Sequence, residues 1–315
     1  MKHIFIVNPV AGPGRVTAEH IENELAKTGV DFEVYISKSP TDITDYVKFR
    51  GNQTPDEQLR FYACGGDGTI KQVVDGVMAL NNAELSVYPI GSGNDFVKYY
   101  GGKDNFLDLK KLCASESHLI DLIKVGDEYS INVTNFGFES AVAATMAKVR
   151  RKKLIGGKNA YTTGIVKALF TSMKTSGDIY VDGEKVNDGL FLVCTIANGN
   201  YVGGSYKCAP RAVTNDGYLE FCLVKPISIF KFLTLIKEYE KGTHLDDPRF
   251  KDILTYKRAK QVTVKSDKEF ALCLDGEIKN VYGFTAEVVH NAVKFAAPTY
   301  PEANIKEDEK ELACK

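Results

Sequence analysis

A glycine-rich turn between a strand-like run and an amphipathic helix constrains the fold most strongly. The turn, Gly65-Gly66-Asp67-Gly68-Thr69, directly follows the apolar run Phe61–Cys64. Behind it, apolar residues recur with the helical spacing i, i+3, i+4 and i+7, at Ile70, Val73, Val74 and Val77. This order predicts a turn at the carboxyl edge of a parallel sheet, where open α/β sheets bind their ligands.

The first 124 residues repeat the alternation of strand and helix. Short apolar runs are separated by segments long enough for a helix, which predicts a parallel sheet wrapped by helices. We therefore expect a Rossmann-like α/β domain over residues 1–124, to which residues 292–315 could return. The runs are Ile4–Val7, Phe32–Ile36, Phe61–Cys64, Leu85–Ile90 and Leu119–Val125.

Residues 125–291 have a different pattern and predict a second, β-rich domain. Apolar runs broken by Gly, Asn and Asp are typical of strands joined by turns. One helix is expected at Ile229–Tyr239, packed on its own domain through one apolar face. That face is formed by Ile229, Phe232, Leu233 and Ile236.

Charge and apolar patterning exclude two classes of protein. A net charge of −1 with 26% charged residues does not suit a nucleic-acid binder. No stretch approaches the roughly 20 apolar residues that a membrane span needs, and the N-terminus shows no signal-peptide pattern. We expect a cytoplasmic protein with buried, reduced cysteines, no nucleic-acid partner and no transmembrane segment.

The first turn carries groups that suit a nucleoside triphosphate. Glycines let the backbone approach a polyphosphate, and the following helix adds unpaired N–H groups and a partial positive charge. Thr69 supplies a hydroxyl, and Asp67 supplies a carboxylate that could hold magnesium. Alone, the turn could also be a simple chain reversal.

A second turn strengthens this interpretation. Pro89-Ile90-Gly91-Ser92-Gly93-Asn94-Asp95-Phe96 also follows a strand-like run and would reach the same sheet edge. Asn94 and Asp95 could cap a helix, but a second carboxylate beside the phosphates favours the functional interpretation. The segment Asn8–Gly12 ends the first strand and could cover the nucleotide.

At these residues the sequence resembles the diacylglycerol kinase catalytic family of bacterial lipid kinases, related to sphingosine and ceramide kinases. The resemblance covers nearly the whole chain. In the second half it is carried by segments in the family's order, namely Asn198-Gly199, Gly203-Gly204, Pro210, Ala212, Asp216-Gly217 and Leu274-Asp275-Gly276-Glu277. It implies an α/β nucleotide-binding domain and a β-sandwich domain, as in NAD kinases and diacylglycerol kinases, with catalysis in the cleft between them.

The resemblance also implies roles for individual residues. Asp275 or Glu277 would accept the proton of the substrate hydroxyl, and Asp67 and Asp95 would lie on the magnesium side of ATP. Asp216 would bind a structural magnesium ion with the backbone carbonyls of Val213 and Tyr218. The nucleotide contacts would be Asn8, Gly12, Ser37, Gly65, Gly66, Asp67, Gly68, Thr69, Ser92, Asn94 and Glu277.

Some positions depart from the family pattern or keep two interpretations. Lys71 and Gln72 stand where the family usually has an amide and a glutamate, and Ser92 stands where threonine is commoner. Asp121 would either join the carboxylates or sit on an exposed strand face.

A basic stretch between Ser140 and Gly177 holds eight basic residues and no acidic one. It is either a solvated charged face or a patch that meets an anionic membrane. Its members are Lys148, Arg150, Arg151, Lys152, Lys153, Lys158, Lys167 and Lys174.

The predicted function is an ATP- and Mg²⁺-dependent lipid kinase that reaches its substrate peripherally at the inner face of the membrane. Diacylglycerol, giving phosphatidic acid, is the family-level substrate. An NAD kinase shares the first turn but not Gly91–Phe96, and a sugar kinase would leave the second-half segments unexplained. A nucleotide-binding regulator without catalysis also stays open, as does a homodimer.

Overall fold

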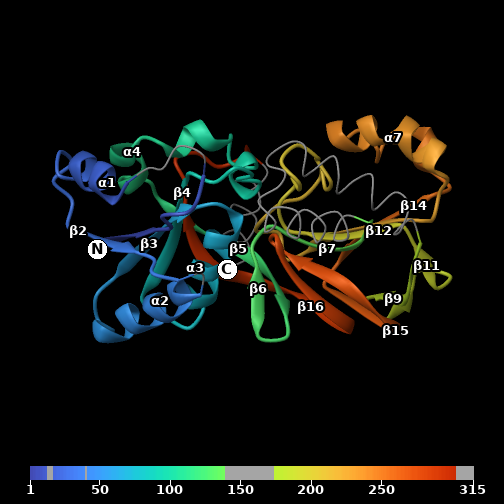
Figure 1. The fold of residues 1–315 in the computed structure, drawn as a ribbon, viewed down its shortest axis with the longest axis horizontal. Helices are drawn as coiled ribbons and strands as arrows, with labels where there is room; N and C mark the ends of the chain where they lie inside the picture. Colours follow the sequence, from blue (N-terminus) through green and yellow to red (C-terminus); the bar gives the residue numbers. More distant parts are fainter. Residues whose placement is uncertain (13–16, 40, 139–173, 303–315) are drawn as a thin grey trace, which may run out of the picture. The chain divides into compact units, whose positions relative to one another are not determined.

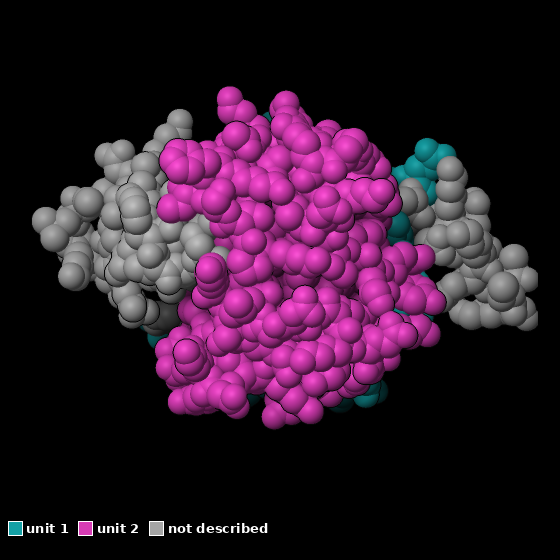
Figure 2. Space-filling view, turned by 90° about the vertical axis from the view of Figure 1, so that its right-hand side faces the viewer, with its two compact units in different colours: residues 1–122, 213–217, 289–315 teal, residues 123–212, 218–288 magenta. Residues whose placement is uncertain are grey.

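The computed structural model describes residues 1–12, 17–39, 41–138 and 174–302. It forms two compact units, coloured separately in Figure 2. The first consists of residues 1–122, 213–217 and 289 onward, and the second of residues 123–212 and 218–288. Two strands, β5 (Ser117–Val125) and β16 (Glu277–Ala296), run from one unit into the other.

The first unit is a parallel sheet covered by helices on both faces. With the end of β16 at one edge, its strand order is β16-β4-β3-β1-β2, with parallel pairing throughout. Helices α1 and α4 lie on one face of this sheet and α2 and α3 on the other (Figure 1). The elements are β1 (Lys2–Val7), α1 (Ala18–Leu25), β2 (Phe32–Ile36), α2 (Asp42–Gln53), β3 (Leu59–Gly65), α3 (Asp67–Val77), β4 (Ala83–Pro89), α4 (Leu109–Cys113), β5 (Ser117–Val125) and two short 3-10 helices, Phe96–Lys98 and Lys103–Phe106.

The apolar pattern explains this unit. Strand β3 is buried at every position, as expected for a central strand covered on both faces. The predicted stripe on α3 is buried too, because Ile70, Val73, Val74 and Val77 are each at most 2% exposed. All five strands predicted in this region form.

The second unit is a β-sandwich whose two layers are connected by two long paired strands, β15 and β16. Strand β15 has an irregularity between Lys265 and Phe270. Its first part pairs with β9 and its last part with β7, so it belongs to both layers. The elements are β6 (Glu128–Ser130), β7 (Val133–Gly137), β8 (Thr175–Ser176), β9 (Asp178–Val181), β10 (Glu184–Lys185), β11 (Leu190–Phe191), β12 (Val193–Ala197), β13 (Leu219–Val224), α7 (Ile229–Lys241), the 3-10 helix Pro248–Phe250, β14 (Leu254–Ala259), β15 (Gln261–Leu274) and β16 (Glu277–Ala296).

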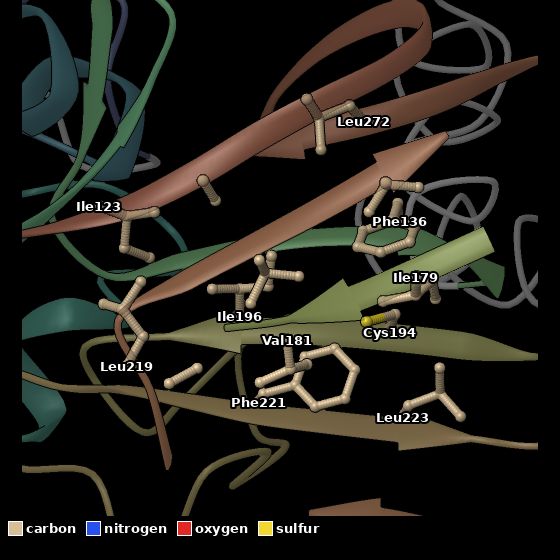
Figure 3. Packing of buried hydrophobic residues seen from close by; sticks show 14 of the residues in the cluster. Ile123, Phe136, Ile179, Val181, Cys194, Ile196, Leu219, Phe221, Leu223 and Leu272 are labelled. Carbon is tan, nitrogen blue, oxygen red and sulfur yellow. The ribbon is translucent and has the colours of Figure 1, made fainter. Parts of the chain in front are cut away.

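The core of the sandwich is built by inward-facing residues of these strands. Figure 3 shows side chains from β7, β9, β12, β13 and β15 gathered in one cluster. The predicted fold class, an α/β domain followed by a β-sandwich, is confirmed. The six described cysteines are buried and free, as expected.

Helix α7 forms where predicted, but one residue of its predicted apolar face points outward. Phe232, Leu235 and Tyr239 are buried, whereas Leu233 is 55% exposed. The prediction for Leu233 was wrong because several apolar residues in this helix fit more than one helical face. In the described part of the chain, no helix combines the length and the apolar character needed to cross a membrane.

Candidate functional site

The sheet of the first unit has a topological switch point between β1 and β3. From β1 the chain moves outward to β2 on one side, and from β3 it moves to β4 on the other. Ligands of open α/β sheets bind outside the carboxyl ends of the strands at such a point. Asn8 and the turn after β3 lie there, since the Asn8 side-chain amide donates to the Thr69 hydroxyl at 3.0 Å. The two predicted segments therefore meet.

The two glycine-rich turns are in direct backbone contact. The N–H groups of Ile90 and Gly91 both donate to the carbonyl of Gly65 at 3.0 Å. A Cβ atom on Gly91 would lie 2.3 Å from the Cα of Gly66. The two turns therefore form one continuous backbone surface at the edge of the sheet. A polyphosphate bound on this surface would meet the backbone N–H groups at the start of α3.

Gly12 allows the segment Asn8–Gly12 to lie directly against the second glycine-rich turn. Its φ is +74°, and an added Cβ would stand 1.8 Å from the carbonyl oxygen of Ile90. Gly12→Ala is expected to lower the free energy of unfolding by about 3 kcal/mol or more, because left-handed strain of about 1–2 kcal/mol adds to a backbone clash. Urea unfolding measures this loss.

Gly29→Ala is the matched control for Gly12→Ala. Gly29 has nearly the same φ, +76°, but an added Cβ would meet no atom within 4 Å. This variant should show the strain alone. Equal losses in the two variants would contradict the close approach of the Gly12 segment to Ile90.

Two carboxylates border the joined turns. Oδ1 of Asp67 accepts the backbone N–H of Asp95 at 2.8 Å. A Cβ on Gly93 would lie 2.8 Å from Oδ2 of Asp67 and 3.9 Å from Oδ2 of Asp95, so both side chains border the same glycine. Asp95 also pairs with Lys98. The arrangement suits Mg²⁺, which proteins commonly bind through one or two carboxylates together with substrate phosphates.

The other residues predicted to contact the nucleotide differ in burial and in hydrogen bonding. Ser92 is exposed, while Asn94 is buried with a φ of 51° and donates to the carbonyl of Gly91 at 2.8 Å. Oδ1 of Asn94 is buried without a hydrogen-bond partner. Ser37 also lies at this sheet edge, but its hydroxyl is 2.8 Å from Oδ1 of Asp42 and is thus engaged within its own loop.

The unusual Lys71 has a structural explanation. Its side chain is only 1% exposed, and its Nζ pairs with Asp75, one turn later on α3, at 2.7 Å. The positive charge is therefore neutralised inside the unit. The basic stretch predicted between Ser140 and Gly177 lies outside the described residues, except for the exposed Lys174.

Asp121 holds the inserted segment 213–217 in the first unit. It is completely buried, so the exposed-face interpretation was wrong. Its Oδ2 accepts the N–H of Gly217 at 2.7 Å, and its Oδ1 lies 2.7 Å from Nδ1 of His290 and accepts the N–H of Asn291 at 2.8 Å. Burial raises the pKa of Asp121. The turn that contains Asp216 is thus fixed by a neighbouring carboxylate.

The described residues contain no group of three or more His, Cys, Asp or Glu side chains that could hold a metal ion. A metal at Asp216 would consequently depend largely on backbone carbonyls such as those predicted at Val213 and Tyr218. Carbonyl oxygens are suitable ligands for hard cations. This site stays a proposal.

In the second unit, Asp275 is tied to a neighbouring turn. Its φ is 46° and its side chain is buried. Oδ2 accepts the N–H of Ile131 at 2.7 Å, and Oδ1 accepts the N–H groups of Asn132 and Val133 at 3.1 and 2.9 Å. Burial raises the pKa of Asp275, while these hydrogen bonds oppose the shift. Glu277, two residues later, is partly exposed.

The partners that sequence reasoning missed include His290, Asn291 and Lys98. The first two follow Asp121 by about 170 residues, and no local pattern connects them. The sequence did contain a signal for the pair of Lys98 with Asp95. Lys98 stands three residues after Asp95, and helical spacing brings such charges together.

Comparison with known proteins identifies the class to which this two-unit fold belongs. Two family models cover most of the chain: the diacylglycerol kinase catalytic domain at residues 2–125, and the YegS C-terminal NAD kinase beta sandwich-like domain at residues 132–297. The chain belongs to this lipid kinase family.

Individual relatives agree with the family models. A protein of Chromohalobacter salexigens named "Probable lipid kinase YegS-like" is 31% identical, covering 76% of each chain. The diacylglycerol kinase of Bacillus subtilis is 28% identical, covering 87% of this chain and 88% of its own. A crystal structure of a diacylglycerol kinase from Bacillus anthracis shares the fold, with a TM-score of 0.68, 19% identity and coverage of 94% and 96%.

Proposed function

We propose that this protein transfers the γ-phosphoryl group of ATP to the hydroxyl of a membrane lipid at the inner face of the membrane, with diacylglycerol as substrate and phosphatidic acid as product. One observation carries the proposal. Two glycine-rich turns, each with a carboxylate, are joined at the switch point of a parallel sheet. Family membership supports a kinase with a lipid substrate.

The phosphates of ATP would lie over the joined turns. Glycine backbone at Gly65–Gly68 lets the chain approach them closely, and the N-terminus of α3 offers N–H groups and a favourable dipole. Thr69, oriented by Asn8, supplies a further polar contact. Ser92 and Asn94 would extend these contacts along the second turn.

Asp67 and Asp95 would hold Mg²⁺ beside the phosphates. The ion, when bound, neutralises charge that develops on the phosphoryl oxygens. The hydrogen bond between Asp67 and the backbone of Asp95 fixes one carboxylate relative to the other turn. Such positioning matters because phosphoryl transfer depends mainly on alignment and charge stabilisation.

We further propose Glu277 as the group that accepts the proton of the substrate hydroxyl. Both oxygens of Asp275 are already bonded by backbone N–H groups, which suits a residue that holds the turn in place. A general base needs a carboxylate within hydrogen-bond reach of the hydroxyl. Asp275 would then act indirectly, by positioning Glu277.

Parallel acceptor assays test the proposed function. The protein is incubated with ATP labelled at the γ-phosphate, Mg²⁺, and one of diacylglycerol, sphingosine, phosphatidylglycerol or NAD. We expect label in phosphatidic acid. Label in another lipid would identify that lipid as the substrate instead of diacylglycerol. Label in NADP would show that the protein is an NAD kinase, and ATP binding without transfer would indicate a regulator.

A further inference from the structure

Helix α7 carries two separate stripes of residues. The inner stripe, Phe232, Leu235, Ile236 and Tyr239, has the spacing i, i+3, i+4 and i+7 and packs into apolar clusters of the second unit. The outer stripe continues the same spacing on the opposite side and consists of Phe230, Leu233, Thr234, Lys237, Glu240 and Lys241. A surface helix normally needs only one apolar stripe.

The outer stripe exposes large apolar side chains. Phe230 is 84% exposed and Leu233 is 55% exposed. They are three residues apart and therefore neighbours on the helix surface. Neither contributes to the core clusters of the second unit. Packing in the core of the second unit therefore does not explain why these two positions are apolar.

The charges around the outer stripe are mainly positive. Lys237 and Lys241 belong to the stripe, and the exposed Lys231 lies beside Phe230. The helix also has two acidic residues, Glu238 and Glu240. Glu238 faces Arg249 at 3.6 Å and Lys241 at 3.8 Å, so its charge is compensated. Glu240 belongs to the stripe, where it is outnumbered by Lys237 and Lys241.

The helix is held in place by its own ends and by its inner face. The Ser228 hydroxyl accepts the N–H of Lys231 at the N-terminus, and Gly242 ends the helix with a φ of 78°. The outer stripe is thus presented on a fixed helix. Apolar side chains next to lysines on one helix face are typical of helices that lie in the interface of an anionic membrane.

We propose that the outer stripe of α7, the helix labelled in Figure 1, docks on an anionic lipid bilayer. Phe230 and Leu233 would enter the acyl boundary, and the lysines would face the lipid headgroups. The choice of a bilayer as the partner rests on the proposed function. Charge complementarity selects the anionic surface, since Lys231, Lys237 and Lys241 outnumber Glu240 on and beside the stripe.

Cosedimentation with vesicles of equal parts phosphatidylglycerol and phosphatidylcholine tests the docking, without ATP. The double variant Phe230→Ser, Leu233→Ser is expected to bind at least about tenfold more weakly, because each side chain loses apolar burial in the bilayer. Phe49→Ser, which removes a 61% exposed phenylalanine from α2, should bind like the wild type. Lys237→Gln should weaken binding about fivefold.

Phosphorylation assays separate this inference from the proposed function. The double variant should retain the wild-type rate on a short-chain diacylglycerol dissolved without vesicles and lose activity on long-chain diacylglycerol in vesicles. If the wild type phosphorylates no lipid, while the double variant still loses vesicle binding, the proposed function fails and the docking stands.

Two results would overturn the docking. One is wild-type vesicle binding by the double variant. The other is a dimeric wild type that becomes monomeric in the double variant with vesicle binding unchanged, which would assign the stripe to contact between two copies of the chain. Sedimentation velocity without vesicles measures the second.

Discussion

Asp67→Asn is expected to lower the rate of phosphoryl transfer at least about a hundredfold, with the fold retained. The carboxylate borders the joined turns, and its loss removes one of the two candidate Mg²⁺ ligands. Electrostatic groups of this kind typically contribute about 100- to 1000-fold to a rate. The measurement is kcat with labelled ATP, together with the Mg²⁺ concentration that gives half the maximal rate, which should rise.

Asp56→Asn provides the control for this loss. Asp56 is exposed in the same unit, so its variant removes the same charge away from the turns. It should retain wild-type kcat and Mg²⁺ dependence. An Asp67→Asn protein with wild-type kcat and an unchanged Mg²⁺ requirement would contradict the assignment of the metal side to this carboxylate.

Asp275→Asn is expected to lower the free energy of unfolding by about 2 to 4 kcal/mol. Asparagine accepts the positive φ of this position, so the backbone need not change. However, an amide replaces an oxygen that now accepts a backbone N–H, and a buried donor is left facing another donor. Urea unfolding measures the loss.

Asp182→Asn is the matched control for Asp275→Asn. Asp182 also has a positive φ, 48°, and accepts backbone N–H groups from Lys260 and Gln261. Unlike Asp275, it is exposed. Both N–H groups bind the same oxygen, Oδ1, which an asparagine amide also supplies at this exposed position, so the expected change is below about 1 kcal/mol. Equal losses at the two positions would show that the buried network around Asp275 adds no stability.

Glu277→Gln separates positioning from proton acceptance. If Glu277 is the base, this variant keeps wild-type stability while its rate falls about 100-fold or more. A Glu277→Gln enzyme with a near wild-type rate would contradict this role and leave Asp275 as the candidate proton acceptor.

The architecture could be predicted because its signals are local. Alternating apolar runs and the helical stripe after Thr69 depend on neighbouring residues, so β3, the turn and α3 follow directly. The approach of the second turn could also be predicted, since parallel strands bring their carboxyl ends to one sheet edge. The resemblance added the order of the second-half segments.

Long-range partners could not be predicted in the same way. The segment 213–217 joins the first unit through Asp121, nearly a hundred residues earlier in the chain. The three N–H groups that bind Asp275 lie more than 140 residues before it. Such contacts depend on how strands pair. The outer face of α7 was missed because its apolar residues fit either side of the helix.

The stoichiometry of lipid phosphorylation tests the central claim most directly. Purified protein, Mg²⁺, labelled ATP and vesicles containing diacylglycerol are combined, and phosphatidic acid and ADP are measured together. The account predicts equal amounts of the two products, both lost in Asp67→Asn. ADP formed without phosphorylated lipid, or neither product despite bound ATP, would contradict a lipid kinase.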